Sequence, residues 1–234
     1  MSWVIYQTEY IKFDLLHLHH KPITEHLLRI YPNTPAICTI HSEIIDLEHP
    51  VIDNRIKNYI CIRPEIQKFI TEDFGVDIGD TSVIYNPFDS TRFKPHPKPK
   101  TEKERVLFVG TIDHLRKEAI EDLISRTKES GKELWILGKK RGDYLDNIEE
   151  SHVKYFEPTW NVENYIHQCD ETAGILLGRT TIEGWLCGRP GIIYQIDESG
   201  SIKSKDLYDP PNDINKFSSK IIIGEIIKTY ELAL

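Results

Sequence analysis

One segment of the sequence combines the residue types that hold a phosphate. Segment 178–190 follows an apolar run at 173–177 and reads Gly-Arg-Thr-Thr-Ile-Glu-Gly-Trp-Leu-Cys-Gly-Arg-Pro. This order predicts a buried strand, a glycine turn at Gly178, a short helix and a helix stop. The backbone N–H groups and the dipole at a helix N-terminus favour a bound anion. The alternative is structural, because Thr180 and Glu183 have the spacing of a capping box and Gly-x-Pro ends helices.

Arg179 strengthens the phosphate interpretation. A cation at a helix N-terminus interacts unfavourably with the helix dipole, so its presence there indicates a bound anion. A guanidinium also matches a phosphate with its fork of N–H donors. Thr180 and Thr181 can donate hydroxyls to the same phosphate, although capping is the favoured role of Thr180. The alternative for Arg179 is a solvated surface side chain.

The second half of the chain must position these residues. Its apolar strands alternate with helices, which predicts an α/β fold with a parallel sheet covered on both faces. Ligands of such sheets bind at the carboxyl ends of the strands. Since Gly110, Gly138 and Gly178 each follow a strand, we expect their turns to line one edge of one cleft. Strands are predicted at 106–109, 133–137, 153–156, 172–177 and 191–196, and helices at 115–128 and 162–168.

Composition narrows the class of protein. Of the 234 residues, 39% are hydrophobic and 28% charged, as in a soluble globular protein. No apolar run approaches the roughly 20 residues of a membrane span, and no secretory signal is evident. The net charge of −8 argues against a nucleic-acid partner. The four cysteines are far apart, which favours reduced thiols in a cytoplasmic protein. Peripheral membrane attachment and the oligomeric state stay open.

The first half is a smaller α/β unit. Its predicted strands lie at 4–6, 15–18, 36–40, 59–62 and 82–85, and its helices at 23–30 and 64–72. Segment 94–104 contains three prolines and predicts a stiff linker, with a surface loop as the alternative. A long helix is predicted at 212–232, although Gly224 weakens it. The expected domains are therefore an N-terminal unit at 1–93, the linker 94–104, a second α/β domain at 105–211 and a terminal helix at 212–234.

Five segments, in order along the chain, resemble motifs of the GT-B glycosyltransferases, specifically the retaining family 4 type. This resemblance implies two Rossmann-like domains facing a cleft, with a nucleoside-diphosphate sugar as donor, and it implies that the domain at 105–211 binds this nucleotide sugar. It rests on D-x-x-H-x-H within 13–19, T-x-H-S within 38–42, V-I-x-N-x-x-D-x-x-x-F-x-P at 83–95, F-V-G followed by a lysine at 108–117, and E-x-x-x-x-G-x-P at 183–190.

The chain also departs from the family pattern. Its first domain is shorter than the family's, which implies a truncated N-terminal domain. Pro87 stands where the family has glycine, and Thr111 replaces the arginine after Gly110. The first of two family glutamates would fall at Ile175, so the carboxylate thought to meet the donor sugar is missing. Nucleotide binding is therefore better supported than the sugar chemistry.

The resemblance assigns roles around the diphosphate. Lys117 would neutralise the leaving diphosphate, and the adjacent Arg116 could share that role. The turns at Gly110, Thr111 and Gly138 belong to the same predicted donor site. The alternative for Lys117 is an exposed lysine on a charged helix.

Further roles concern the rest of the donor and the acceptor. Glu183 would accept hydrogen bonds from the ribose hydroxyls, and Trp160, beside Asn161, would stack on the base. His41 would touch the donor sugar or orient the acceptor. The alternatives are a core tryptophan and a structural histidine. His17 and His19 share one strand face and could bind a metal, but the resemblance implies chemistry without one.

The sequence thus predicts a metal-independent, retaining glycosyltransferase with no cofactor beyond its donor. The acceptor would be a carbohydrate, a lipid-linked molecule or another hydroxyl compound. One alternative is a nucleotide-sugar-binding or partner-binding relic of the fold, motivated by Ile175. Others are a compact nucleotide- or DNA-modifying glycosyltransferase and an epimerase.

Overall fold

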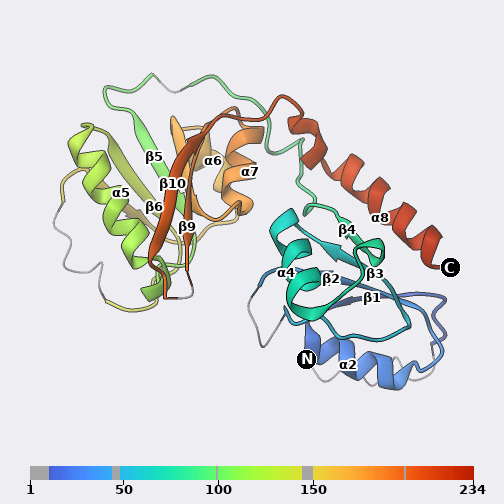
Figure 1. Ribbon diagram of the computed structural model, residues 1–234. Coiled ribbons are helices and arrows are strands. Elements are labelled where there is room, and N and C mark those ends of the chain that lie inside the picture. The colour runs from blue at the N-terminus through green and yellow to red at the C-terminus, as the bar shows by residue number, and fades with distance from the viewer. Residues whose placement is uncertain (1–10, 44–47, 99, 144–149, 198) are drawn as a thin grey trace. The chain divides into compact units, whose positions relative to one another are not determined.

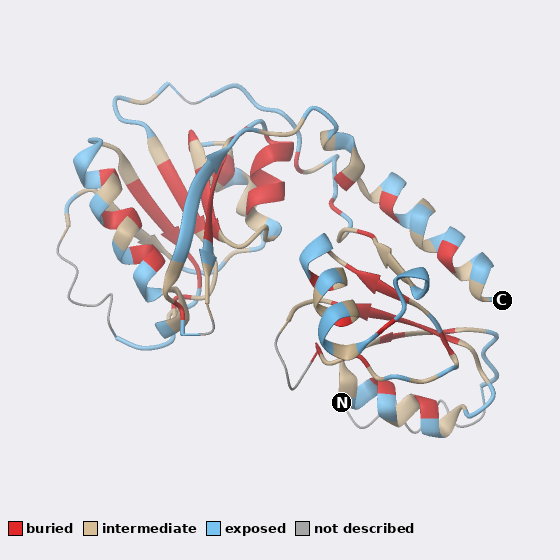
Figure 2. Cartoon of the chain, in the orientation of Figure 1, coloured by how far each residue is buried: buried red, intermediate tan, exposed pale blue. Residues whose placement is uncertain are grey.

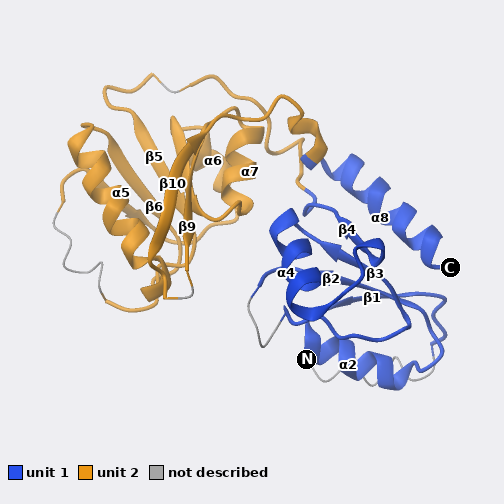
Figure 3. Cartoon of the chain, viewed as in Figure 1, with its two compact units in different colours: residues 1–87, 217–234 blue, residues 88–216 orange. Residues whose placement is uncertain are grey.

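The computed structural model describes residues 11–43, 48–98, 100–143, 150–197 and 199–234. The chain forms two compact units: unit 1 comprises 1–87 and 217–234, and unit 2 comprises 88–216 (Figure 3). The division after Pro87 precedes the expected boundary at residue 93, and the terminal helix belongs to unit 1. The strand predicted at 4–6 lies outside the described residues.

The sheet of unit 1 is parallel throughout, in the order β1-β2-β3-β4 (Figure 1). Its predicted strands are confirmed, with β3 beginning three residues earlier than expected. The helices that connect the strands start at Lys21 and Pro64, each with a proline in the first turn, where no N–H partner is needed. The elements are β1 (Leu16–His19), α2 (Lys21–Ile30), β2 (Ala36–Ile40), β3 (Ile56–Cys61), α4 (Pro64–Phe74), η2 (Ile78–Asp80) and β4 (Thr81–Val83).

Helices cover both faces of this sheet. Every residue of β2 is buried, as expected for a central parallel strand (Figure 2). Cys38 and Ile40 belong to the cluster that includes Leu28 of α2 and Ile66 of α4. Ile37, on the opposite face, packs in a second cluster with residues of α8 (Ser219–Ala233).

The predicted helix at 212–232 is interrupted. A short 3-10 turn, η4 (Ile214–Phe217), precedes α8, because Ser218 is extended with φ −67° and ψ 141°. The apolar side expected for this helix included Ile221 and Ile222, of which Ile222 is buried and Ile221 is 42% exposed. Gly224 lies inside α8 without breaking it.

The sheet of unit 2 has the order β10-β9-β8-β5-β6-β7, with all strands parallel except the antiparallel edge strand β10. The five predicted strands are confirmed. β10 is absent from the prediction because its residues are mostly polar and exposed, so they leave no apolar run. The strands are β5 (Arg105–Val109), β6 (Glu133–Leu137), β7 (Val153–Phe156), β8 (Glu171–Ile175), β9 (Gly191–Ile196) and β10 (Ile202–Tyr208).

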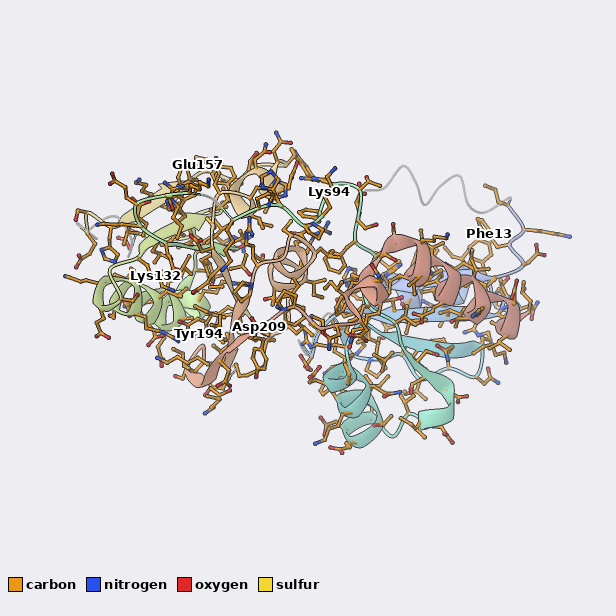
Figure 4. All side chains as sticks on the ribbon, turned by 90° about the horizontal axis from the view of Figure 1, so that it is seen from above. Phe13, Lys94, Lys132, Glu157, Tyr194 and Asp209 are labelled. Carbon is orange, nitrogen blue, oxygen red and sulfur yellow. The ribbon has the colours of Figure 1, made fainter. Side chains whose placement is uncertain are left out.

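The helices of unit 2 lie on opposite faces of its sheet (Figure 1). α5 (Lys117–Glu129) covers one face, where Tyr194 of β9 donates its hydroxyl to Asp122 of α5 at 2.8 Å (Tyr194 is labelled in Figure 4). α6 (Val162–Ile166) and α7 (Arg179–Leu186) cover the other face. α7 approaches β8 so closely that a Cβ on Gly184 would lie 2.5 Å from Thr172 Oγ1.

This arrangement creates a topological switch point between β5 and β8. The chain leaves β5 for α5 on one face and leaves β8 for α7 on the other, while β5 and β8 are neighbours in the sheet. Crevices at such points bind nucleotides in open parallel sheets. The carboxyl ends of β5 and β8 are therefore the place to examine for a ligand site.

The proline-rich segment at 94–104 belongs to unit 2 and is partly attached to it. The buried Arg189 donates from Nη2 to Pro97 O at 3.0 Å. The His96 ring stacks on the His167 ring, with centroids 4.5 Å apart. This part of the expected linker is thus held against the unit that follows it.

All four cysteines are buried free thiols, as predicted. Within the described ranges, no helix has both the length and the apolar character needed to cross a membrane.

Candidate functional site

Three turns of unit 2 meet at the carboxyl edge of its sheet. Gly110 N donates to Leu137 O at 3.1 Å, and a Cβ on Gly138 would lie 1.7 Å from Gly110 O. Thr180 Oγ1 donates to Val109 O at 3.3 Å, which ties the start of α7 to the end of β5. The prediction that the turns after the three strands share one edge is therefore confirmed.

The turn after β8 differs from the prediction. The strand ends at Ile175, two residues early, and the left-handed residue is Leu176 (φ 55°) rather than Gly178. Gly178 N donates to Leu176 O at 2.8 Å, which closes a tight turn. Gly178 has φ −91° and ψ 178°, and it is the N-cap of α7. Its role is therefore to begin the helix and not to supply a positive φ.

The predicted capping box is wrong. Thr180 lies inside α7 and donates to β5, while Glu183 pairs with Arg179. No side chain caps the start of this helix within the described part of the chain. The first N–H groups of α7 therefore lie at the switch point without a side-chain acceptor, which is the arrangement expected at an anion site. The predicted helix stop is confirmed, because Gly188 is left-handed with φ 76°.

Thr181 is separated from this edge. Its side chain is fully buried, and its Oγ1 lacks a hydrogen-bond partner among the described residues. A Cβ on Gly191 would lie 2.7 Å from Thr181 Cγ2, and one on Gly174 3.2 Å from its Oγ1. Thr181 thus packs α7 onto β8 and β9, which corrects the expectation that its hydroxyl would reach a phosphate.

Glu183 and Arg179 form an ion pair on the first turns of α7. Glu183 Oε1 accepts from Arg179 Nε at 2.6 Å. The Glu183 side chain is 6% exposed and that of Arg179 66%. Burial raises the pKa of Glu183, although the Arg179 charge opposes this shift. The Arg179 guanidinium also lies 5.6 Å from the centre of the buried Phe88 ring.

A second ion pair adjoins the first. Arg92 Nη2 lies 2.5 Å from Glu163 Oε2, and the Arg92 charge also acts on Glu183. Phe88 and Arg92 belong to the 83–95 motif, but their place beside Glu183 was not predicted. The apolar spacing of Phe88 and Phe93 was the available signal, because both rings are buried in unit 2.

The turn after β5 favours Arg116 over Lys117 as the cation nearest the switch point. Asp113 caps the short helix η3 (His114–Arg116) and binds Arg116 Nη1 at 2.6 Å. A Cβ on Gly110 would lie 3.9 Å from Arg116 Nε. Lys117 is half exposed, with its Nζ 3.7 Å from Glu121 Oε1 one turn along α5.

Trp160 follows β7 and is 90% exposed. It lies in the turn that begins after Phe156, at Glu157 (labelled in Figure 4), and ends where Asn161 starts α6. The core alternative for this tryptophan is therefore wrong. The exposed indole leaves base stacking as the role still to be tested.

His41 lies in unit 1, at the carboxyl end of β2, within a group of four histidines. Its Nε2 is 2.9 Å from His19 Nδ1, and its backbone N–H donates to Glu48 Oε2 at 3.0 Å. Glu48 is 3% exposed and also lies 2.5 Å from His20 Nδ1. His20 has a left-handed φ of 62°, a conformation that costs energy for a non-glycine residue. No motif or spacing pointed to the roles of His20 and Glu48.

His17 belongs to the same group of histidines and lies farther from the carboxyl edge of the sheet. Its two ring nitrogens are 2.6 Å from Tyr230 Oη and 2.7 Å from Thr39 Oγ1. Burial lowers the pKa of His17 to about 4, and the neighbouring histidines add to the shift. Burial also lowers the pKa values of His19 and His41. Across the described residues, no three His, Cys, Asp or Glu side chains are grouped to hold a metal ion.

Ile175, at the family's first glutamate position, is a partly buried residue packed against the α5-side core. Asp113 and Glu183, the acids beside Arg116 and Arg179, are paired with those cations. The departure noted in the sequence therefore persists in the structure.

The two units, each with a parallel sheet, have the GT-B fold, as predicted. Solved structures of that fold cover nearly all of this chain. Anabaena HepE, solved with UDP and glucose, has a TM-score of 0.67 and 16% identity, over 98% of this chain and 80% of that chain. A Rickettsia africae glycosyltransferase has a TM-score of 0.68 and 10% identity, over 99% of this chain and 80% of that chain. The lipopolysaccharide outer core galactosyltransferase WaaB has a TM-score of 0.61 and 17% identity, over 96% of this chain and 70% of that chain. No known family profile matches the sequence, and no curated protein matches it either.

Proposed function

We propose that this protein transfers a sugar from a nucleoside-diphosphate sugar to a hydroxyl acceptor. The observation that carries the proposal is the switch point of unit 2. There the start of α7, which has no side-chain cap, meets the Gly110 turn and the Arg116 guanidinium. Such a place suits a diphosphate. The complexes of HepE with UDP and with UDP-glucose, which share the fold, add support.

The donor would be held by separate groups for its separate parts. The N–H groups at the start of α7, with Arg179 and Arg116, would bind the diphosphate. Lys117 would add positive charge from the start of α5. Glu183 would accept the ribose hydroxyls, and Trp160 would stack on the base.

The chemistry follows from the charge that develops on the leaving group. When the bond from the anomeric carbon to the diphosphate breaks, negative charge grows on the departing oxygen, and fixed cations stabilise it. The acceptor oxygen forms the new bond, and its proton passes to the leaving phosphate. Front-face attack of this kind retains the anomeric configuration. We propose that no metal takes part, because Arg116, Lys117 and Arg179 would supply the positive charge.

The acceptor would be a carbohydrate, a lipid-linked molecule or another hydroxyl compound. His41 is the proposed acceptor-side residue, since it ends a strand of unit 1 and is held by Glu48 and His19. With a lowered pKa, its ring would be neutral at pH 7 and able to accept a proton or a hydrogen bond.

A thermal-shift panel of nucleoside diphosphates and their sugars on the full chain tests donor binding. A ligand that binds the folded state should raise the melting temperature, and calorimetry should give its affinity. Glu183→Gln and Arg116→Gln should weaken binding, whereas Lys68→Gln, in unit 1 and paired with Glu72 along its helix, should not. If no compound shifts the wild type, or if all variants bind alike, the proposed donor site is wrong.

One observation favours a second function, donor binding without transfer. Ile175 is apolar where the family carries a carboxylate for the donor sugar. Donor binding with no release of the nucleoside diphosphate, alone or with an acceptor panel, would favour this second function. Turnover would exclude it, and nuclear magnetic resonance of the product's anomeric proton would test retention.

A further inference from the structure

Arg179 and Glu183 are placed so that each blocks the other's role in donor binding. Arg179 Nε donates to Glu183 Oε1 at 2.6 Å along one helix turn. The carboxylate is 6% exposed and the guanidinium 66%, so the acid is fixed while the cation can move. A carboxylate oxygen that holds a guanidinium N–H is less able to accept a ribose hydroxyl.

The cost of separating this pair decides which ligands can bind. A buried carboxylate that loses its partner destabilises the folded state unless new donors replace that partner. A ribose diol supplies two O–H donors, but the Arg179 guanidinium then needs a new acceptor. Arg179 is the first residue of α7, next to the N–H groups proposed to hold the diphosphate. A diphosphate at those groups is the acceptor that the displaced guanidinium requires.

We propose that Arg179 makes nucleoside binding conditional on the diphosphate. In the unliganded protein, Arg179 is paired with Glu183. When a nucleoside diphosphate enters, Arg179 turns to the phosphates and Glu183 receives the ribose. A nucleoside without phosphates must break the ion pair with no compensation, so it is rejected. This inference rests on the proposed function, because it assigns Arg179 as the residue that sets the specificity of that same site.

The surroundings of Arg179 suit this movement. Its guanidinium lies 5.6 Å from the Phe88 ring centre and faces solvent over most of its surface. Arg92, the other cation near Glu183, has its own partner in Glu163 at 2.5 Å. Arg92 is therefore held by a partner of its own, while Arg179 is paired with Glu183 itself.

The test compares uridine and UDP on the full chain at pH 8, far above the ordinary pKa of a carboxyl group. Calorimetry measures UDP, and ligand-observed nuclear magnetic resonance measures the weaker uridine. Arg179→Gln should weaken UDP binding about tenfold or more, since about 1.4 kcal/mol is a factor of ten. The same variant should tighten uridine binding several-fold, because Glu183 no longer has to leave a partner.

Two further variants complete the test. Lys68→Gln, which removes an ion pair of the same spacing in unit 1, should change neither affinity. Arg179→Lys keeps the charge and should retain most of the UDP affinity without improving uridine. If UDP binds the wild type but Arg179→Gln leaves uridine binding unchanged or weaker, this inference is wrong while the proposed function stands. If no nucleoside diphosphate of the panel, UDP included, binds the wild type, both fail.

Discussion

The polar side chains at the carboxyl edges of the two sheets differ in how they are paired. In unit 1, His19, His41 and Glu48 bond to one another, and His17 bonds to Thr39 and Tyr230. In unit 2, the cations of the edge each pair with an acid on the same short stretch of chain, and the start of α7 has no side-chain cap.

This difference indicates what each edge can do. Side chains that satisfy one another form a fixed surface that can orient a hydroxyl compound. Cations whose partners are three or four residues away can exchange them for a phosphate without rearranging the fold. Two sheets of similar architecture thus end in different edges. One holds its side chains in fixed positions, and the other carries cations that can exchange their partners.

The largest expected effect removes the close backbone contact on which the unit 2 edge depends. Gly138→Ala would place a Cβ 1.7 Å from Gly110 O, so the backbone must move. We expect the free energy of unfolding to fall on the order of 3 kcal/mol, measured by urea denaturation. Gly224→Ala is the matched control, because a Cβ there meets no atom within 4 Å and should stabilise α8 by up to about 1 kcal/mol. Equal midpoints for the two variants would contradict the contact.

Acidification should affect the two edges with opposite sign. The folded pKa of His17, about 4, lies below the unfolded value of about 6.5, so the unfolded chain binds the extra proton between them. Stability from His17 is therefore complete above pH 6.5 and is lost as the pH falls toward 4, on the order of 2 kcal/mol after allowing for partial exposure. The raised pKa of Glu183 acts in the other direction, because the folded state gains its proton first.

Hydrogen exchange at pH 7.5 and 5, read separately for peptides of each unit, would measure this contrast. Peptides of unit 1 should lose protection at pH 5 more than those of unit 2. His17→Gln should reduce the difference, although His19 and His41 also contribute. Equal loss in both units, unchanged by His17→Gln, would show that the histidine group does not set the acid response.

The smallest expected effect compares two adjacent cations of unit 2. Arg116→Gln should weaken UDP binding about tenfold, because its guanidinium lies beside the Gly110 turn. Lys117→Gln should weaken it less than about threefold, since Lys117 lies along α5 with Glu121. Calorimetry with UDP separates the two. A larger loss for Lys117→Gln would restore the role that the sequence resemblance gives that lysine.

Most strands were predictable because buried parallel strands are continuous apolar runs. Leu134–Leu137 and residues 106–109 have no polar interruption, and the structure buries nearly all of them. β10 was not predictable in this way, because an exposed antiparallel edge strand needs no apolar residues. The turn at Leu176 was missed because its left-handed φ falls on a residue type that rarely adopts it.

The candidate site was predictable in its location and less so in its contacts. Glycines after strands located the edge, because their spacing follows from the chain topology. Side-chain partners were harder, since spacing alone admits several pairings. Thr180 and Glu183 fit a capping box, yet Arg179 and the end of β5 take those two side chains instead. The link from His20 to Glu48 spans two loops whose approach no local pattern encodes.

Unit 1 is made from two stretches of chain, 1–87 and 217–234, with all of unit 2 between them. The sheet face that carries Ile37 and Ile60 is therefore covered only after α8, with Ile222, has been synthesised. Unit 2 is continuous and has its whole core as soon as residue 216 leaves the ribosome. Vectorial synthesis should consequently finish the later-made unit first. A released chain that ends just before α8 would therefore fold its second unit while its first unit still exposes an apolar face to water.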